Sequence, residues 1–135
     1  MTKEEVIDLI RDTGWGMLAT CVDGQPFVRP MMPLLTDDNR IILGLLARSR
    51  TIEHINKNPK AEICFVDRKM WYARISGEAK MSDNMEDKEL LWNCIPHLKQ
   101  YFGSVDDENF KLMEMAITGV EAMSPHQKSP ENIDF

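Results

Sequence analysis

The chain has 135 residues, of which 43% are hydrophobic and 28% charged, as is usual for one globular domain. Its net charge of −6 argues against nucleic acid as a partner, because binding to a phosphate backbone needs a basic face. No apolar run is long enough to span a membrane, and the acidic, amphipathic N-terminus lacks the apolar core of a signal peptide. We therefore expect a cytoplasmic protein without a membrane partner.

The first elements are marked by their caps and turns. Thr2 and Glu5 have the spacing of a capping box, and apolar residues then recur at helical period as far as Gly14, which predicts a helix. Asp23-Gly24 is typical of a two-residue hairpin turn. Strands are expected over 15–22, 26–35, 40–46, 60–66, 70–81 and 109–123.

Two prolines and a glycine interrupt the expected strands. Pro30 and Pro33 lack a backbone hydrogen-bond donor, so the strand over 26–35 should be an edge strand or a bulged one. Gly77 indicates a bulge within the strand over 70–81.

Two further helices are expected after the third strand. A short amphipathic helix should end near Asn58-Pro59, because the residue before a proline disfavours helical backbone. A longer helix over roughly 84–101 should be kinked or divided by Pro96. The inner face of this longer helix is expected to carry Leu90, Leu91, Cys94, Ile95 and Leu98.

These elements predict a fold that is mainly β with α additions. Six antiparallel strands in so short a chain favour a small closed or partly closed barrel, because closure removes exposed strand edges. We expect a single domain over 1–123. The polar, proline-bearing tail over 124–135 is expected to be poorly ordered.

Cysteines and histidines do not cluster in the sequence. The three cysteines are far apart, and no two of them have the spacing of a zinc ligand pair. Cys21 and Cys64 lie in apolar, strand-like runs, where buried thiols are common. The sequence predicts neither a metal site nor a disulfide framework.

A cationic corner, Arg48-Ser49-Arg50-Thr51, stands where the strand over 40–46 passes into the short helix. Ser49 has the position of an N-cap, whose usual role is to accept a hydrogen bond from a free N–H of the first turn. Capping does not explain the two arginines, because cations oppose the dipole at a helix N-terminus. An anion such as phosphate, bound by free N–H groups, hydroxyls and guanidinium groups together, would explain them. The residues alone leave both interpretations open.

Arg29 is a second unusual cation, because it falls in an otherwise apolar strand where an unpaired charge pointing inward would be costly. In an antiparallel meander, the strand over 26–35 would lie beside the strand over 40–46. Arg29 would then reach the same anion as the cationic corner.

Three stretches occur in an order that resembles a known family. They are "GMLATCVDGQPFVRPM", "SRTIEHINKNPKAEICF" and "WYARISGEAKM", and the most specific parts are "DGQPFVRP" and "SRTIEHINKNP". Over roughly residues 4–123 the chain is similar to the pyridoxamine 5'-phosphate oxidase-like FMN-binding split-barrel proteins. The resemblance implies a six-stranded antiparallel split β-barrel with flanking helices. It also implies a homodimer that holds FMN at the subunit interface and acts on a small-molecule substrate.

The resemblance assigns a role in cofactor binding to several positions. Arg29 matches an arginine near the FMN phosphate and ribityl chain, Ser49 and Arg50 match the phosphate-binding pair, and Tyr72 matches a polar side chain that reaches the cofactor. The residues expected to follow the flavin ring or to complete the socket are Pro30, Met31, Met32, Gly44, Leu45, Arg48 and Thr51.

The chain also departs from the family pattern. Gly44-Leu45 replaces a pair that often ends in threonine, and Thr51 stands where a second cation is common. The position of the substrate-binding lysine of true pyridoxamine phosphate oxidases is Leu34, and their C-terminal Arg-x-His motif is missing.

We therefore expect an FMN-binding flavoprotein, an oxidoreductase acting on an unidentified small molecule and not a true pyridoxamine phosphate oxidase. No residue stands out as an acid or base; Tyr72 and His54 are candidates, although each residue type is more often structural than catalytic. The alternatives are a non-catalytic flavin- or haem-binding split-barrel module, and a structural dimer whose arginines hold only solvent or sulfate.

Overall fold

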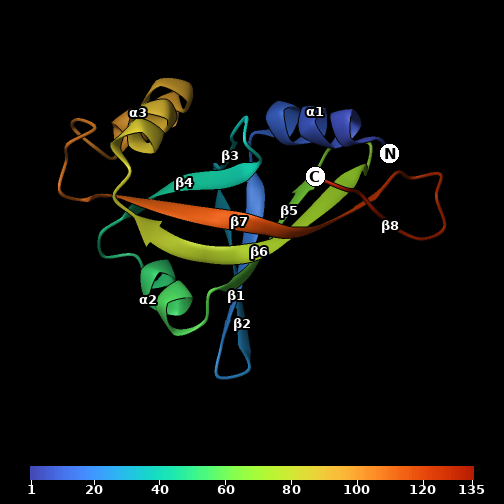
Figure 1. Ribbon diagram of the computed structural model, residues 1–135, viewed down its shortest axis with the longest axis horizontal. Coiled ribbons are helices and arrows are strands. Elements are labelled where there is room, and N and C mark those ends of the chain that lie inside the picture. The colour runs from blue at the N-terminus through green and yellow to red at the C-terminus, as the bar shows by residue number, and fades with distance from the viewer.

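A computed structural model describes residues 1–135 as one strongly curved antiparallel sheet with helices against it (Figure 1). The strand order is β2-β1-β5-β6-β7-β4-β3, and β8 pairs with β7. The elements are α1 (Lys3–Thr13), β1 (Gly16–Val22), β2 (Gln25–Met31), β3 (Leu34–Leu35), β4 (Arg40–Leu46), α2 (Arg50–Lys57), β5 (Lys60–Val66), β6 (Tyr72–Ser82), α3 (Met85–Cys94), the 3₁₀ helix η1 (Pro96–Gln100), β7 (Phe110–Met123) and β8 (Glu131–Asn132). The expected split-barrel, α+β fold is confirmed, with two additional two-residue strands. No helix is long and apolar enough to cross a membrane.

The N-terminal helix and the first hairpin follow their sequence signals. The hydroxyl of Thr2 accepts from the N–H of Glu5 and the carboxylate of Glu5 accepts from the N–H of Thr2, which completes the capping box. Gly14 ends the helix in the left-handed region at φ 70°. Asp23 and Gly24 both have positive φ, as a two-residue hairpin turn requires.

The sheet is split where the chain passes from β2 to β3. β2 is an edge strand that pairs only with β1, as its prolines predict. Two residues, Met32 and Pro33, separate it from β3, which pairs with β4 at the opposite edge. The expectation that Arg29 lies on a strand beside 40–46 is therefore wrong: the break at Pro33 delays pairing with β4 until Leu34.

Gly77 lies at the bulge that the sequence predicts, although the extra residue belongs to the neighbouring strand. Ser76 pairs with Gly119 and Gly77 pairs with Ile117, so Thr118 of β7 is left over. A Cβ built on Gly77 would lie 2.3 Å from the carbonyl oxygen of Ala116. Glycine is needed here because β7 approaches β6 too closely for any side chain.

Pro96 divides the longer helix, as expected, into α3 and η1. The predicted inner face is wrong at two positions, because Leu90 and Cys94 are exposed. Leu91 and Leu98 are buried as predicted, and Asp87, which was not predicted, is buried as well. The reason is an ion pair: a carboxylate oxygen of Asp87 lies 2.7 Å from Nη1 of Arg40 on β4, which turns this face of α3 toward the sheet.

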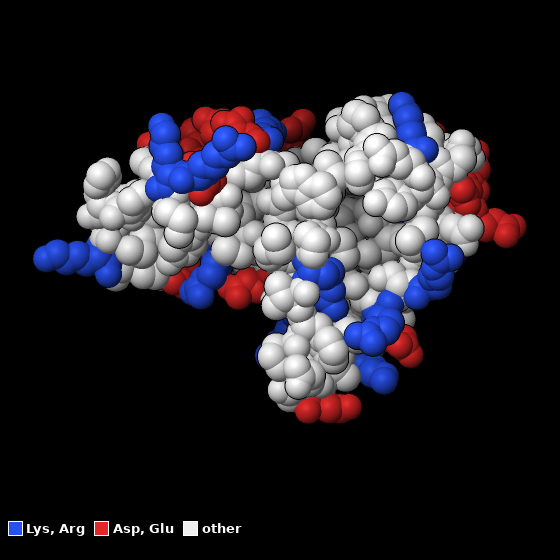
Figure 2. Space-filling view, turned by 180° about the vertical axis from the view of Figure 1, so that it is seen from behind, with Lys and Arg blue, Asp and Glu red and all other residues white.

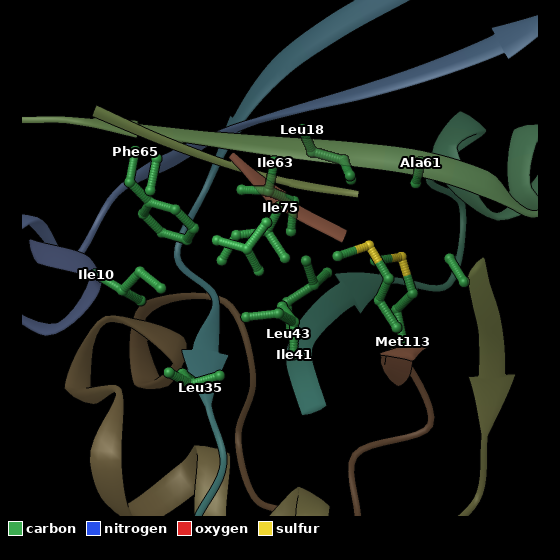
Figure 3. Packing of buried hydrophobic residues seen from close by; sticks show 14 of the residues in the cluster. Ile10, Leu18, Leu35, Ile41, Leu43, Ala61, Ile63, Phe65, Ile75 and Met113 are labelled. Atoms are coloured by element: carbon green, nitrogen blue, oxygen red, sulfur yellow. The ribbon is translucent and has the colours of Figure 1, made fainter. Parts of the chain in front are cut away.

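The hydrophobic core has two parts on the two faces of β4. The larger part fills the barrel and includes Leu18, Ile41, Ile63, Phe65, Ile75 and Met113 (Figure 3). The smaller part lies under α3 and η1 and consists of Ile42, Leu91, Leu98, Phe102, Phe110 and Leu112. Because Ile41, Ile42 and Leu43 are all buried, β4 is covered on both faces.

The C-terminal tail is more ordered than expected. Glu131 and Asn132 form β8 against β7, and the carboxylate of Glu131 pairs with the N-terminal amine of Met1. Ile133 and Phe135 pack against the larger core. The polar composition of the tail predicted a poorly ordered segment. In the structure, these apolar residues and one terminal ion pair hold the tail against the rest of the chain.

We expect Gly77→Ala to lower the free energy of unfolding by about 2 kcal/mol or more, because β7 must move to admit the methyl group. The control is Gly119→Ala on the neighbouring strand, where an added Cβ meets nothing within 4 Å. That variant should change stability by less than about 0.5 kcal/mol. Urea unfolding measures both, and equal effects would contradict the close approach.

Candidate functional site

A cavity of about 440 Å³ lies beside the split in the barrel. One wall is the end of β2 and the link to β3, and the other is the end of β4 with the corner that follows it. Eight of the lining residues are hydrophobic. The predicted site residues that line it are Pro30, Met31, Met32, Gly44, Leu45, Arg48 and Ser49.

An aromatic wall, missed by the sequence analysis, completes the cavity: Trp15 before β1, and His97, Tyr101 and Phe102 in and just after η1. The ring of His97 lies edge-on to Trp15, with centroids 5.9 Å apart, and to Tyr101, at 5.3 Å. Trp15 and Tyr101 are about half exposed, which is unusual for large aromatic side chains. The available signal was Pro96, since this proline starts the short helix that carries His97 and leads into Tyr101 and Phe102.

The absence of a side chain on Gly44 keeps the floor of the cavity apolar and tightly packed. A Cβ there would lie 2.9 Å from the ring of Phe110 and 3.2 Å from Leu98. Leu45 is 3% exposed. Gly44 and Leu45 therefore form a floor without hydroxyl groups, as their departure from the family pattern indicated.

The four residues of the cationic corner have different surroundings. Ser49 caps α2, because its hydroxyl accepts from the N–H of Thr51 at 3.2 Å, so the cap interpretation is confirmed. Arg48 and Ser49 also line the cavity. Arg50 instead lies over the ring of Phe27, and Thr51 is buried.

Arg29 reaches this corner through α2, which packs on β1, and not through a neighbouring strand. Nη1 of Arg29 donates to the hydroxyl of Thr20 at 2.8 Å, and Nη2 donates to Nδ1 of His54 at 2.9 Å. Burial and the charge of Arg50 lower the pKa of Arg29 from its usual value. The two guanidinium groups are thus close enough to repel each other.

None of Arg29, Arg48 and Arg50 forms an ion pair with a carboxylate of the chain. Arg40 and Arg74, by contrast, each have acidic partners. Lys and Arg side chains also gather beside the projecting β1–β2 hairpin, on the side of α2 (Figure 2). This corner therefore presents unneutralised positive charge next to an apolar cavity, an arrangement that suits a ligand with an anionic end and a flat apolar end.

His54 is the buried titratable group of this cluster, with a side chain that is 8% exposed. Its ring lies 4.3 Å from that of Phe27. Burial, followed by the charges of Arg29 and Arg50, lowers the pKa of His54 below its usual value. Because a guanidinium can only donate, Nδ1 of His54 accepts, and the neutral ring carries its proton on Nε2.

Tyr72 is not brought to the cavity within one chain. It begins β6 and pairs with Met123, whereas the cavity lies near the other end of this sheet, where Leu46 pairs with Phe110. Its side chain is on the outer face of the sheet, since the adjacent Ala73 points into the core. No cluster of His, Cys, Asp and Glu that could hold a metal is formed.

The family model described as "Pyridoxamine 5'-phosphate oxidase" matches residues 2–124. Among solved structures, the General Stress Protein 26 from Bacillus anthracis str. Sterne has a TM-score of 0.81 at 21% identity, covering 90% of this chain and 92% of that chain. A NimC/NimA family protein from Clostridium acetobutylicum has a TM-score of 0.79 at 26% identity, covering 96% and 90%. A heme binding protein from Mycobacterium smegmatis has a TM-score of 0.79 at 16% identity, covering 96% of this chain and 56% of that chain. No curated protein matches the sequence.

We expect His54 to make the chain less stable in mild acid. Its folded-state pKa is lowered, whereas in the unfolded chain it returns to about 6.5. As the pH falls below that value, the unfolded chain takes up the proton first, and stability falls until the lower folded pKa is passed. Urea unfolding between about pH 7.5 and 5.5 should therefore show a smaller loss of stability in His54→Asn than in the wild type.

The control for this measurement is His126→Asn, because His126 is exposed in the tail. It should follow the wild-type pH dependence. Identical pH dependence of the wild type and His54→Asn would show that His54 has an ordinary pKa.

Proposed function

The chain belongs to the pyridoxamine 5'-phosphate oxidase family, and we propose that it binds FMN and acts as an oxidoreductase on a small molecule. One observation carries this proposal: Arg48 lines an apolar cavity with an aromatic wall, and Arg29 and Arg50 lie close to the same corner, all three without a carboxylate partner. An FMN molecule has the matching shape, with a phosphate at one end and a flat ring system at the other.

The phosphate would be held at the N-terminus of α2. Arg48 and Ser49 are on the cavity side of this terminus, and Arg50 is on the other side. Burial, followed by the charge of Arg50, lowers the pKa of Arg29, and a dianionic group there would offset the repulsion between the two arginines. The helix dipole favours the same charge at this position.

The flavin ring would lie in the cavity between the chain over 30–32 and the aromatic wall. Flat aromatic surfaces bind one another through stacking and edge-to-face contacts, which Trp15, His97 and Tyr101 offer. When bound, FMN supplies the hydride or single-electron chemistry, and the protein supplies binding and exclusion of water.

The residues do not support oxidation of pyridoxamine phosphate itself. Leu34, which stands at the position of the family's substrate lysine, belongs to β3 and packs against the smaller core. It offers no charge for a substrate phosphate. We therefore propose a different, unidentified small-molecule substrate.

We propose that the protein is a homodimer in which a second copy closes the cavity. Met17 and Val28 are 46% and 65% exposed on the outer sheet face, which continues at Pro30 to the rim of the cavity. Tyr72 lies on the same face. A partner that covers this face would bury the exposed apolar surface and could bring its own Tyr72 toward the flavin.

A non-catalytic haem-binding module is the second candidate, and His97 favours it. An imidazole exposed to an apolar cavity is a common iron ligand for haem. A structural neighbour is described as a heme binding protein. The cationic corner would then hold a carboxylate of the haem instead of a phosphate.

We expect the purified protein to retain FMN after excess cofactor is removed, as measured by its visible absorption spectrum. Arg29→Ala and Arg48→Ala should each weaken FMN binding about 10- to 100-fold, because each removes a charge-assisted hydrogen bond. Binding of riboflavin, which lacks the phosphate, should change little. Arg68→Ala in the exposed turn between β5 and β6 is the matched control.

Unchanged FMN affinity in both arginine variants would rule out the phosphate socket. Titration with hemin tests the alternative. A haem spectrum that His97→Ala abolishes, in a protein that does not retain FMN, would favour the haem-binding module.

We expect sedimentation to give twice the 15.6 kDa of one chain. Val28→Asp should shift the protein to monomer and weaken FMN binding together, because it places a charge on the outer sheet face. Met85→Asp, at the exposed start of α3, which packs on β4, should leave the dimer intact. Dimers in both variants would contradict the proposed interface.

A further inference from the structure

We propose that Thr20 and His54 are positioning residues that aim the guanidinium of Arg29 at the phosphate of the ligand. This inference rests on the proposed function, because it assumes an anion at the cationic corner. It assigns a role to His54 that is neither catalytic nor solely structural.

The first support is that two neighbouring side chains hold the two terminal nitrogens of the Arg29 guanidinium. The hydroxyl of Thr20 and Nδ1 of His54 are 3.0 Å apart, and each accepts from a different terminal nitrogen of the guanidinium. Backbone carbonyl oxygens of Leu18 and Phe27 add longer contacts at 3.3 and 3.4 Å, both to Nη1. The planar end of Arg29 is therefore fixed in two directions.

The second support is that all these acceptors are neutral. A carboxylate in their place would fix the side chain equally well, but it would cancel the charge that an incoming anion needs. Thr20 and His54 orient the guanidinium and leave its charge available. The Nε–H of Arg29 makes no hydrogen bond within the chain and is not fully buried, so it can donate a hydrogen bond to an anion.

The third support is that burial, followed by the charge around it, lowers the pKa of His54 and so favours its neutral ring. Arg29 faces it from β2, and Arg50, Glu53 and Lys57 act on it from its own helix, so cations outnumber the single carboxylate. β1 contributes only the neutral Thr20. A neutral ring keeps the Nδ1 lone pair that Arg29 requires.

The test compares dissociation constants for FMN and for riboflavin, because only FMN has the phosphate that Arg29 would bind. His54→Leu and Thr20→Val should each weaken FMN binding about tenfold and leave riboflavin binding unchanged. The conservative variants His54→Asn, which keeps an acceptor near the place of Nδ1, and Thr20→Ser should restore most of the FMN affinity. A general loss of structure would weaken both ligands equally.

A double-mutant cycle completes the test. In an Arg29→Ala background, His54→Leu should have no further effect on FMN binding, because the group that it positions is gone. Equal loss of FMN and riboflavin binding, or full additivity in the cycle, would overturn the positioning role. Should His54→Leu fail to fold, the Thr20 pair of variants gives the same comparison.

The two proposals fail in different ways. If Arg29→Ala leaves the ratio of FMN to riboflavin affinity unchanged, then Arg29 does not bind the phosphate. That result would overturn both the phosphate contact of Arg29 and the positioning role of its partners. A changed ratio in Arg29→Ala, with unchanged ratios in His54→Leu and Thr20→Val, would leave the socket in place and overturn only the positioning role.

Discussion

The break in the sheet at Met32 and Pro33 is the constraint on which the rest of the structure depends. Proline cannot donate to a strand ladder, so the chain leaves one edge of the barrel at β2 and resumes pairing at the other edge as β3. The two edges remain unjoined, and the cavity lies beside this opening. A continuous strand over 26–35 would close the barrel and leave no room for a ligand at this place.

The placement of charge is as specific as the break in the sheet. The chain has 22 acidic and 16 basic residues, so carboxylates are plentiful. They neutralise Arg40, which ties α3 to β4, and Arg74 on the outer sheet face. No carboxylate forms an ion pair with Arg29 or Arg50, and burial together with the charge of Arg50 lowers the pKa of Arg29, so a bound anion would be favoured here.

Local signals predicted the features that depend on neighbours in sequence. The capping box at Thr2, the hairpin at Asp23-Gly24, the cap at Ser49 and the division at Pro96 each follow from the backbone preference of one or two residues. Periodicity also placed the six main strands.

What the sequence could not predict depends on contacts between distant segments. The aromatic wall joins Trp15 to rings about eighty residues later, and no periodicity links them. Arg29 reaches the cationic corner through His54 of α2, a route that only the packing of α2 on β1 creates.

Because these contacts also decide what the cavity can hold, they bear on the choice of ligand. The arginines would accept a flavin phosphate or a haem carboxylate alike, so charge does not discriminate. The position of His97 suits both ligands too: as one ring of an aromatic wall it would contact a flavin, and as an imidazole exposed to the cavity it would bind an iron atom, so only the choice between these two roles separates the candidates.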